Sequence, residues 1–165
     1  MNLEAIMKKD EKTNVMRVLD GKKTAYTGHF YEPDATLTGV QIAGILGEDP
    51  AKVFKTLVTQ GKTGAYYVFV VPVEAELDLK KAAKAAGEKS IEMIKQKDLL
   101  PLTGYVHGGC SPIGMKKHFR TFLHATATDF DKMFVSAGKV GAQIEIAPGD
   151  LISVAGCTVA DIVSE

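Results

Sequence analysis

The sequence predicts a mixed α+β fold in which helices and strands are interspersed along the chain. Helical patterns closed by glycine, such as the run 79–86 before Gly87, alternate with short apolar runs rich in aromatic and β-branched residues, such as 65–71. A short turn with glycine at both ends, residues 61–64, joins two apolar runs directly, which is typical of an antiparallel hairpin. Because parallel strands need long crossover connections, such hairpins favour a mixed sheet over a doubly wound parallel one.

Length and composition indicate an ordinary globular protein. The 165 residues suit a single domain spanning 1–165, long enough to bury a core, and 45% of them are hydrophobic against 24% charged. The 20 basic side chains equal the 20 acidic ones, so overall charge predicts no DNA partner, and contact with any nucleic acid needs a local basic patch. Two clusters are dense enough, although a solvated face is the plainer explanation of each: Lys116, Lys117 and Arg120, and Lys80, Lys81 and Lys84.

The sequence gives little support for membrane, metal or redox sites. It has no apolar run of about 18 residues and no hydrophobic signal core at its start, so we expect no membrane partner. Cys110 and Cys157 are isolated, without a C-x-x-C spacing, which fits a reducing cytoplasm. The four histidines show no H-E-x-x-H or H-x-E grouping, so we expect no metal and no other cofactor.

Capping residues define the expected helices. Thr13 is expected to cap a helix that stops at Gly21. Thr38 and Gln41 form a capping box for a second helix, which ends at Gly47 and has apolar residues at helical spacing. Further helical segments are expected as a single turn after Asp49, from Asp78 to Gly87, near 95–100 and over 148–154.

Short apolar runs define the expected strands. The run 65–71 reads as a buried strand that Pro72 ends, because proline lacks the N–H that a sheet ladder needs. Residues 1–9 show no such pattern and are expected to be a frayed start. The expected strands cover residues 25–31, 53–59, 65–71, 90–93, 121–125, 133–136, 143–146 and 159–162.

A glycine-rich loop, residues 108–114 (Gly-Gly-Cys-Ser-Pro-Ile-Gly), is the first candidate for binding a ligand. Glycine lets a ligand approach the main chain, and proline stiffens the loop, so amide N–H groups are free to point at an electronegative atom. A tight surface turn is the plainer reading. Met115 stands where a phosphate-binding P-loop needs lysine, and Ile113 where a hydrolase nucleophile elbow around Ser111 needs glycine, so neither chemistry follows.

Lys55 is the second candidate, because it lies between Phe54 and Leu57 in an apolar strand. One interpretation is that Lys55 lies at a sheet edge or on the surface. The other is that it is a cation that faces a pocket, where it binds a phosphate or a developing negative charge. Tyr31, at the end of the first strand, either walls such a pocket or packs in the core. A second small-residue loop begins at Ser136, and a plain turn is its simpler explanation. No nucleophile–base pair stands out.

Several motifs together resemble the YbaK/EbsC family, and most closely its free-standing Cys-tRNA(Pro) deacylases. The resemblance runs from about Thr13 to the C-terminus and implies a barrel-like mixed β-sheet flanked by helices, the fold of YbaK and of prolyl-tRNA synthetase-associated domains. It also implies an enzyme that hydrolyses the ester between a mischarged amino acid and the 3′ end of tRNA. The motifs that carry it are residues 54–57, 77–84, 108–114, 135–139 and 145–151.

The resemblance also implies roles for particular residues. The strand lysine that the family requires corresponds to Lys55, which would be catalytic. The segment after Tyr31 aligns only with a length change, so Phe30 could take the place of Tyr31, and Gln143 lies where close relatives vary, which leaves substrate choice open. The residues implied to bind substrate are Tyr31, Thr56, Gly108, Gly109, Ser111, Pro112, Gly114, Ser136 and Gly138.

The implied partner is aminoacyl-tRNA, contacted at its 3′ end in the cytoplasm, with prolyl-tRNA synthetase as a further candidate partner. Cys-tRNA(Pro) is the favoured substrate. One alternative is a deacylase for another mischarged tRNA, such as Ala-tRNA(Pro). The other is a non-catalytic module that binds an aminoacyl or nucleotide-like ligand.

Overall fold

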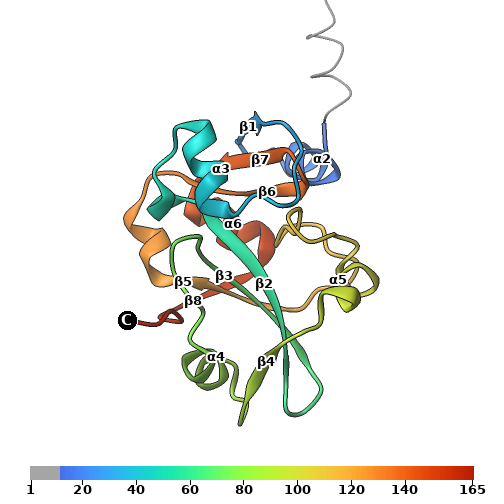
Figure 1. Ribbon diagram of the computed structural model, residues 1–165, viewed down its shortest axis with the longest axis vertical. Coiled ribbons are helices and arrows are strands. Elements are labelled where there is room, and N and C mark those ends of the chain that lie inside the picture. Colours follow the sequence, from blue (N-terminus) through green and yellow to red (C-terminus); the bar gives the residue numbers. More distant parts are fainter. Residues whose placement is uncertain (1–11) are drawn as a thin grey trace, which may run out of the picture.

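A computed structural model of the chain describes residues 12–165, so the frayed start expected at 1–9 lies outside the described part. Within it, eight strands form two sheets, β1-β7-β6 and β4-β2-β3-β5-β8 (Figure 1). The elements are α2 (Asn14–Gly21), β1 (Thr27–Phe30), α3 (Gly39–Leu46), η1 (Pro50–Lys52), β2 (Phe54–Gly61), β3 (Tyr66–Pro72), α4 (Leu79–Ala86), β4 (Ile91–Met93), α5 (Gln96–Thr103), β5 (Arg120–His124), η2 (Ala125–Asp129), β6 (Met133–Lys139), β7 (Ala142–Ile146), α6 (Pro148–Ala155) and β8 (Cys157–Ala160).

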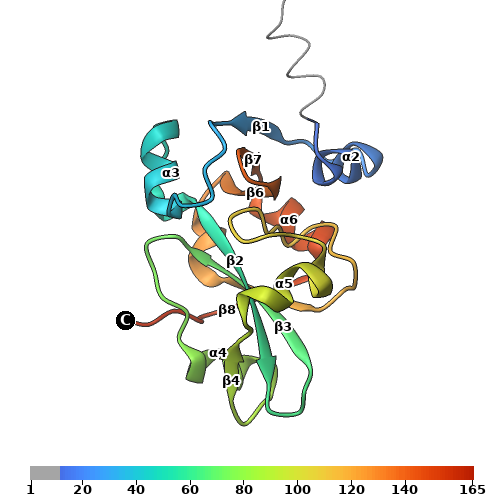
Figure 2. The ribbon, with the colours of Figure 1, turned by 45° about the vertical axis from the view of Figure 1, so that its right-hand side comes forward.

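The three-stranded sheet has one apolar and one polar face. Strand β7 lies between β1 and β6 and pairs antiparallel with both. Ile144 and Ile146 of β7 are fully buried in the main core cluster, together with Leu19 of α2 and Leu151 of α6. Successive residues of a strand point to opposite faces, so Gln143 and its strand neighbours at alternate positions face away from this core. Figure 2 shows α3 and α2 at opposite ends of the sheet.

The five-stranded sheet is mixed, as the sequence predicts. Strand β2 runs antiparallel to β3 and β4, whereas β3 pairs with β5, and β5 with β8, in parallel. A second core cluster packs α4 onto this sheet, with the rings of Phe69 and Phe122 stacked at 5.2 Å between centroids. Within residues 12–165 the two sheets do not close into a barrel, although an isolated bridge between Val53 and Phe134 joins them.

The register of β4 leaves part of β2 unpaired. Strand β4 pairs only with Thr59, Gln60 and Gly61, at the far end of β2. Beyond the isolated bridge between Val53 and Phe134, residues 55–57 therefore pair with β3 on one side and, within the described residues, with no strand on the other. An open edge presents unpaired backbone groups to whatever lies beside it, and here that is a pocket.

The caps follow the sequence-based expectations. Thr13 accepts a hydrogen bond from the Met16 N–H at 3.2 Å, and Thr38 and Gln41 form the reciprocal capping box. Asp78 caps α4, and Gly47 and Gly87 end their helices in left-handed conformations that suit glycine. One helix end differs, because α5 continues through Pro101 to Thr103, whose hydroxyl donates to the Leu99 carbonyl at 2.7 Å.

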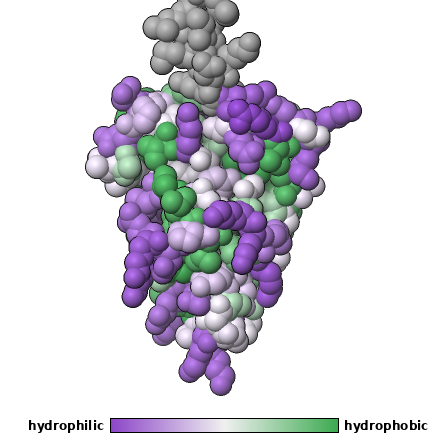
Figure 3. All heavy atoms as spheres, turned by 90° about the vertical axis from the view of Figure 1, so that its right-hand side faces the viewer, coloured by the Kyte–Doolittle hydropathy of each residue, from purple (hydrophilic) through white to green (hydrophobic). Residues whose placement is uncertain are grey.

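The described surface carries isolated apolar residues. On the face shown in Figure 3, hydrophobic patches are interrupted by hydrophilic side chains. Ile45 of α3 is 59% exposed, and Ala43 alone in that helix is buried, so its helical spacing of apolar residues does not mark a core-facing stripe. No helix within residues 12–165 is long and apolar enough to cross a membrane.

Candidate active site

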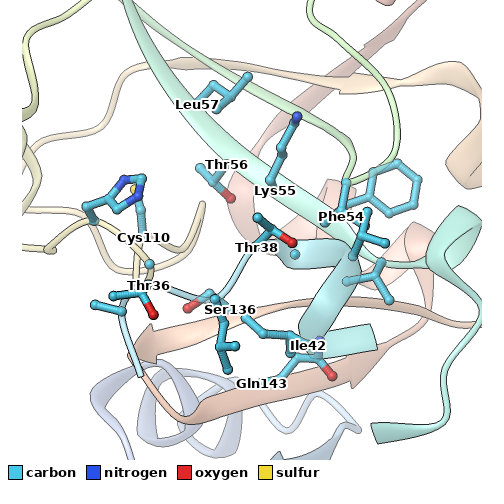
Figure 4. A pocket seen from close by; sticks show the side chains of 18 of the residues that line it. Thr36, Thr38, Ile42, Phe54, Lys55, Thr56, Leu57, Cys110, Ser136 and Gln143 are labelled. Carbon is cyan, nitrogen blue, oxygen red and sulfur yellow. The ribbon is translucent and has the colours of Figure 1, made fainter. Parts of the chain in front are cut away.

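A pocket of about 590 Å³ opens between α3, the open edge of β2 and the two glycine-containing loops (Figure 4). Pockets of this size hold ligands as large as a small cofactor. Most of its wall is apolar, and a few polar groups converge on it. The polar lining residues are Tyr31, Thr36, Thr38, Lys55, Thr56, Glu76, His107, Ser136 and Gln143.

Lys55 and Thr56 enter the pocket from the open edge of β2. Lys55 is half-buried, and within residues 12–165 it has no carboxylate partner. The hydroxyl oxygen of Thr56 is shielded from solvent and makes no hydrogen bond there. Both groups are thus free to bind a ligand. Phe54 and Leu57 of the same strand also line the pocket (Figure 4).

Tyr31 forms one wall of the pocket, and Phe30 does not contribute to the lining. The backbone N–H of Tyr31 donates to the carbonyl of Gly141 at 3.0 Å, which fixes the segment after β1 against the turn between β6 and β7. Phe30 instead packs against the main core cluster. The structure therefore places Tyr31 rather than Phe30 at this position.

Only part of the first glycine-rich loop reaches the pocket. Gly108, with φ +86°, and Cys110 line it. Gly109 instead lies against the backbone of the second loop, where an added Cβ would come within 2.9 Å of the Lys139 Cα. Ser111, Pro112 and Gly114 do not line the pocket either. The resemblance implies that these four residues, Gly109 included, bind substrate, but the structure does not bring them to the pocket.

The remainder of that loop acts as a support. Ser111 is fully buried, and its hydroxyl accepts a hydrogen bond from the Ile113 N–H at 3.2 Å. The Tyr105 hydroxyl donates to the Ile113 carbonyl. Pro112 and Gly114 border a separate hollow of about 90 Å³ on the other side of the loop. The half of the loop that follows Cys110 is therefore anchored to the core.

Cys110 has the features of a packed residue. It is 9% exposed and belongs to the main core cluster. Burial raises the pKa of its thiol to about 12, so the thiolate form is scarce at neutral pH. No hydrogen bond to a base activates it within the described residues.

The second loop, which begins at Ser136, also reaches the pocket with only some of its residues. Ser136 lines the pocket, and its hydroxyl accepts a hydrogen bond from the Gly138 N–H at 3.2 Å. Gly138 has φ +94° and does not line the pocket, since it lies against Val15 and Tyr105. Gly138 therefore orients Ser136, and the structure does not bring it to the pocket.

Sequence reasoning missed a polar cluster beneath the pocket. Gln143 is 4% exposed, lines the pocket, and pairs in register with Ser136 and with His29. His29 Nε2 lies 2.8 Å from a Glu145 carboxylate oxygen. Glu48, just after α3, adjoins this group, and burial raises the pKa of its carboxyl, while Gln143 and His29 oppose that shift. The resemblance marks Gln143 only as a position where close relatives vary, and the alternation of β7 is the sequence signal for its face; no local pattern connects it to Glu48.

The described residues contain no group of three or more His, Cys, Asp or Glu side chains arranged to hold a metal ion. The polar groups at the pocket are the Lys55 cation, the Glu76 carboxylate, the His107 imidazole, several hydroxyls, the Gln143 amide and backbone groups. Such a set can stabilise a developing oxyanion and orient a polar substrate.

Known proteins similar to this chain carry the same architecture. The family model "Aminoacyl-tRNA editing domain" matches residues 33–154. A protein of Enterococcus faecalis (strain ATCC 700802 / V583), named "Putative Cys-tRNA(Pro)/Cys-tRNA(Cys) deacylase EbsC", is 44% identical over 159 residues, which cover 96% of this chain and 97% of that protein.

Two solved structures share the fold. The crystal structure of "a putative trans-editing enzyme for prolyl tRNA synthetase" matches with a TM-score of 0.79 and 24% identity, covering 92% of this chain and 95% of that one. The hypothetical protein APE2540 matches with a TM-score of 0.83 and 22% identity, covering 91% and 99% of the two chains. The family match and the extended identity confirm the resemblance seen in the sequence: this chain belongs to the aminoacyl-tRNA editing domain family.

Proposed function

We propose that this protein hydrolyses the ester bond of mischarged aminoacyl-tRNA, with Cys-tRNA(Pro) as the favoured substrate. The observation that carries the proposal is Lys55, a cation with no carboxylate partner within residues 12–165, which lines a pocket of about 590 Å³. The family supports the reaction class, and the name of the 44% identical relative supports the substrate. The pocket volume suits an aminoacyl group and the terminal ribose better than a tRNA stem.

Lys55 stabilises the negative charge that develops on the ester carbonyl oxygen. A cation held in a partly dry pocket is far more effective than one in water, and it needs no reorganisation during the reaction. The Gly108 backbone and the Ser136 hydroxyl position the carbonyl and the ribose. Tyr31 and Thr56 complete the wall around them.

The nucleophile comes from the substrate. The sulfur of the cysteinyl group attacks its own carbonyl carbon, the bond to the ribose 3′-oxygen breaks, and the thiol proton passes to that oxygen. The products are tRNA with a free 3′-hydroxyl and a cyclic thioester, which water then opens to cysteine. This route fits a pocket in which the Cys110 thiol is held protonated by burial, with its pKa raised to about 12.

Prolyl-tRNA synthetase is the partner that would deliver the substrate. The net charge of zero predicts weak binding to a tRNA backbone, because phosphate contacts depend on basic groups. Recognition of the 3′ end alone does not identify the tRNA, so a synthetase that holds the tRNA body would supply that selectivity. Such a partnership fits a protein that acts in the cytoplasm, with the translation machinery.

A panel of charged tRNAs tests the proposal. Purified protein is incubated with Cys-tRNA(Pro), Ala-tRNA(Pro) and Pro-tRNA(Pro), and the release of each amino acid is followed over time. We expect cysteine to be released fastest, and addition of prolyl-tRNA synthetase to lower the apparent KM. Faster release of alanine would reassign the substrate, and binding without turnover of any of the three would identify a non-catalytic module.

A further inference from the structure

An amide on the pocket floor has an oxygen without a partner. Gln143 lines the pocket and is 4% exposed, yet its Oε1 atom is shielded from solvent and accepts no hydrogen bond within residues 12–165. A buried amide oxygen left unpaired is destabilising, so native proteins rarely keep one without a use for it.

A buried carboxyl group, that of Glu48, adjoins this amide. Both carboxylate oxygens of Glu48 are shielded from solvent, and neither has a hydrogen-bond partner of standard geometry within the described residues. The Gln143 amide is nevertheless close enough to lower the pKa of Glu48, against the larger opposing effect of burial. The other titratable neighbours are His29 and Glu145, and the side chains of these two already pair with each other at 2.8 Å.

The backbone holds Glu48 in this place. Its N–H donates to the Ala43 carbonyl at 2.8 Å, in the hydrogen-bonded turn that closes α3 after Gly47. The C-terminal end of a helix carries partial negative charge, which disfavours a carboxylate there. Glu48 therefore needs a donor, and the Gln143 amide is the neighbour that can supply one.

The nitrogen and oxygen of a glutamine amide exchange places when the side-chain amide makes a half-turn. With Nε2 toward Glu48, the carboxylate gains a donor and Oε1 turns into the pocket. We propose that Glu48 fixes the Gln143 amide in this orientation, so that Oε1 accepts a hydrogen bond from the α-ammonium group of the bound aminoacyl ester. This inference rests on the deacylase function proposed above and adds the residue that recognises the amino group.

The positions of Lys55 and Gln143 support this placement of the substrate. Figure 4 shows Lys55 on β2 and Gln143 across the pocket from it. An aminoacyl ester has a cation on its α-carbon and a carbonyl oxygen that becomes negative during the reaction. Lys55 attracts the oxygen and repels the ammonium, while Gln143 Oε1, with the Glu48 carboxylate adjoining the amide, attracts the ammonium. The ester is therefore bound in one orientation, and aminoacyl-tRNA with a blocked amino group is a poorer substrate.

A comparison of free and blocked substrates tests the inference. The rate constant kcat/KM is measured on Cys-tRNA(Pro) and on N-acetyl-Cys-tRNA(Pro), which keeps the thiol but lacks the cation. The parent protein should prefer the free amine by about 10- to 100-fold, the range for a hydrogen bond to a charged group. In Gln143→Leu, which has similar volume and no acceptor, that preference should fall to within about threefold.

Glu48→Gln separates positioning from direct contact. It removes the charge that orients the Gln143 amide, so the preference for the free amine should fall by a smaller factor than in Gln143→Leu. The substitution should raise KM more than it lowers kcat. The matched control is Glu74→Gln, which removes a negative charge from an exposed residue next to pocket-lining Val73. The control should keep the full preference.

Nitrogen-15 NMR of the side-chain amides gives a readout that does not depend on turnover. The Gln143 NH₂ resonance should shift with pH in the parent as Glu48 titrates, and should lose that shift in Glu48→Gln. An unchanged N-acetyl penalty in folded Gln143→Leu, or a pH-independent Gln143 resonance in the parent, would overturn the inference. Absence of turnover on every charged tRNA by the parent would instead overturn the deacylase function.

Discussion

Gly109→Ala tests whether the two glycine-containing loops support each other. The added Cβ would lie 2.9 Å from the Lys139 Cα and 2.9 Å from the Val140 backbone nitrogen. Carbon atoms pack at about 3.5–4.0 Å, so the two loops must separate by roughly 0.5–1 Å. Both contacts involve backbone, which cannot rotate away as a flexible side chain can. Gly109 does not share the left-handed φ of its neighbour Gly108, so the expected effect of the substitution is steric.

The expected cost follows from this contact. Overpacking of a well-packed site costs about 1–3 kcal/mol. For a protein of this size, each kcal/mol lowers Tm by roughly 2–4 °C, so the expected fall is about 2–12 °C. Gly108 and Cys110 flank the substitution and line the pocket, and a displacement of about 1 Å near bound substrate can lower activity by up to roughly 100-fold.

Thermal unfolding and deacylation of Cys-tRNA(Pro) are measured side by side. Gly149→Ala is the control, because nothing lies within 4 Å of its added Cβ, and it should leave both quantities near those of the parent. If Gly109→Ala matches the parent and the control in Tm and in kcat/KM, the loops are not packed as described and the steric reasoning is wrong.

Three further predictions concern the pocket. Lys55→Ala should lower kcat on Cys-tRNA(Pro) by about 100-fold or more with little change in Tm, because it removes one electrostatic stabiliser; a folded variant with most of its activity would remove Lys55 from the mechanism. Cys110→Ala should keep deacylation within a few-fold of the parent, and a trapped thioester on Cys110 would contradict this. Glu48→Gln should raise the free energy of unfolding at pH 7, since burial raises the pKa of Glu48 and its ionised form destabilises the fold. That gain should shrink as the pH falls through the raised pKa and vanish below the ordinary pKa of a glutamate, which denaturant titrations at several pH values would show.

Local elements were predictable because their causes are local. The capping box of Thr38 and Gln41 and the cap at Asp78 involve residues two or three positions apart, so they are visible in the printed sequence and appear in the structure. The glycine turn 61–64 likewise predicts the β2–β3 hairpin that is observed. Helix α3 shows the limit of this reasoning. The spacing of its apolar residues predicted the helix, but it did not predict that the helix covers one side of the pocket.

The sequence by itself determined the mixed α+β class, the positions of most helices and strands, and Lys55 as a candidate cation, because periodicity, caps and a polar residue in an apolar run are properties of short segments. The tertiary structure alone decided which of those segments meet. The register of β4 opens the edge beside Lys55, packing turns Ser111 and Gly114 away from the pocket, and the end of α3 brings Glu48 to Gln143. These contacts join residues tens of positions apart, and their geometry depends on how the sheets and loops pack together, which no local pattern records.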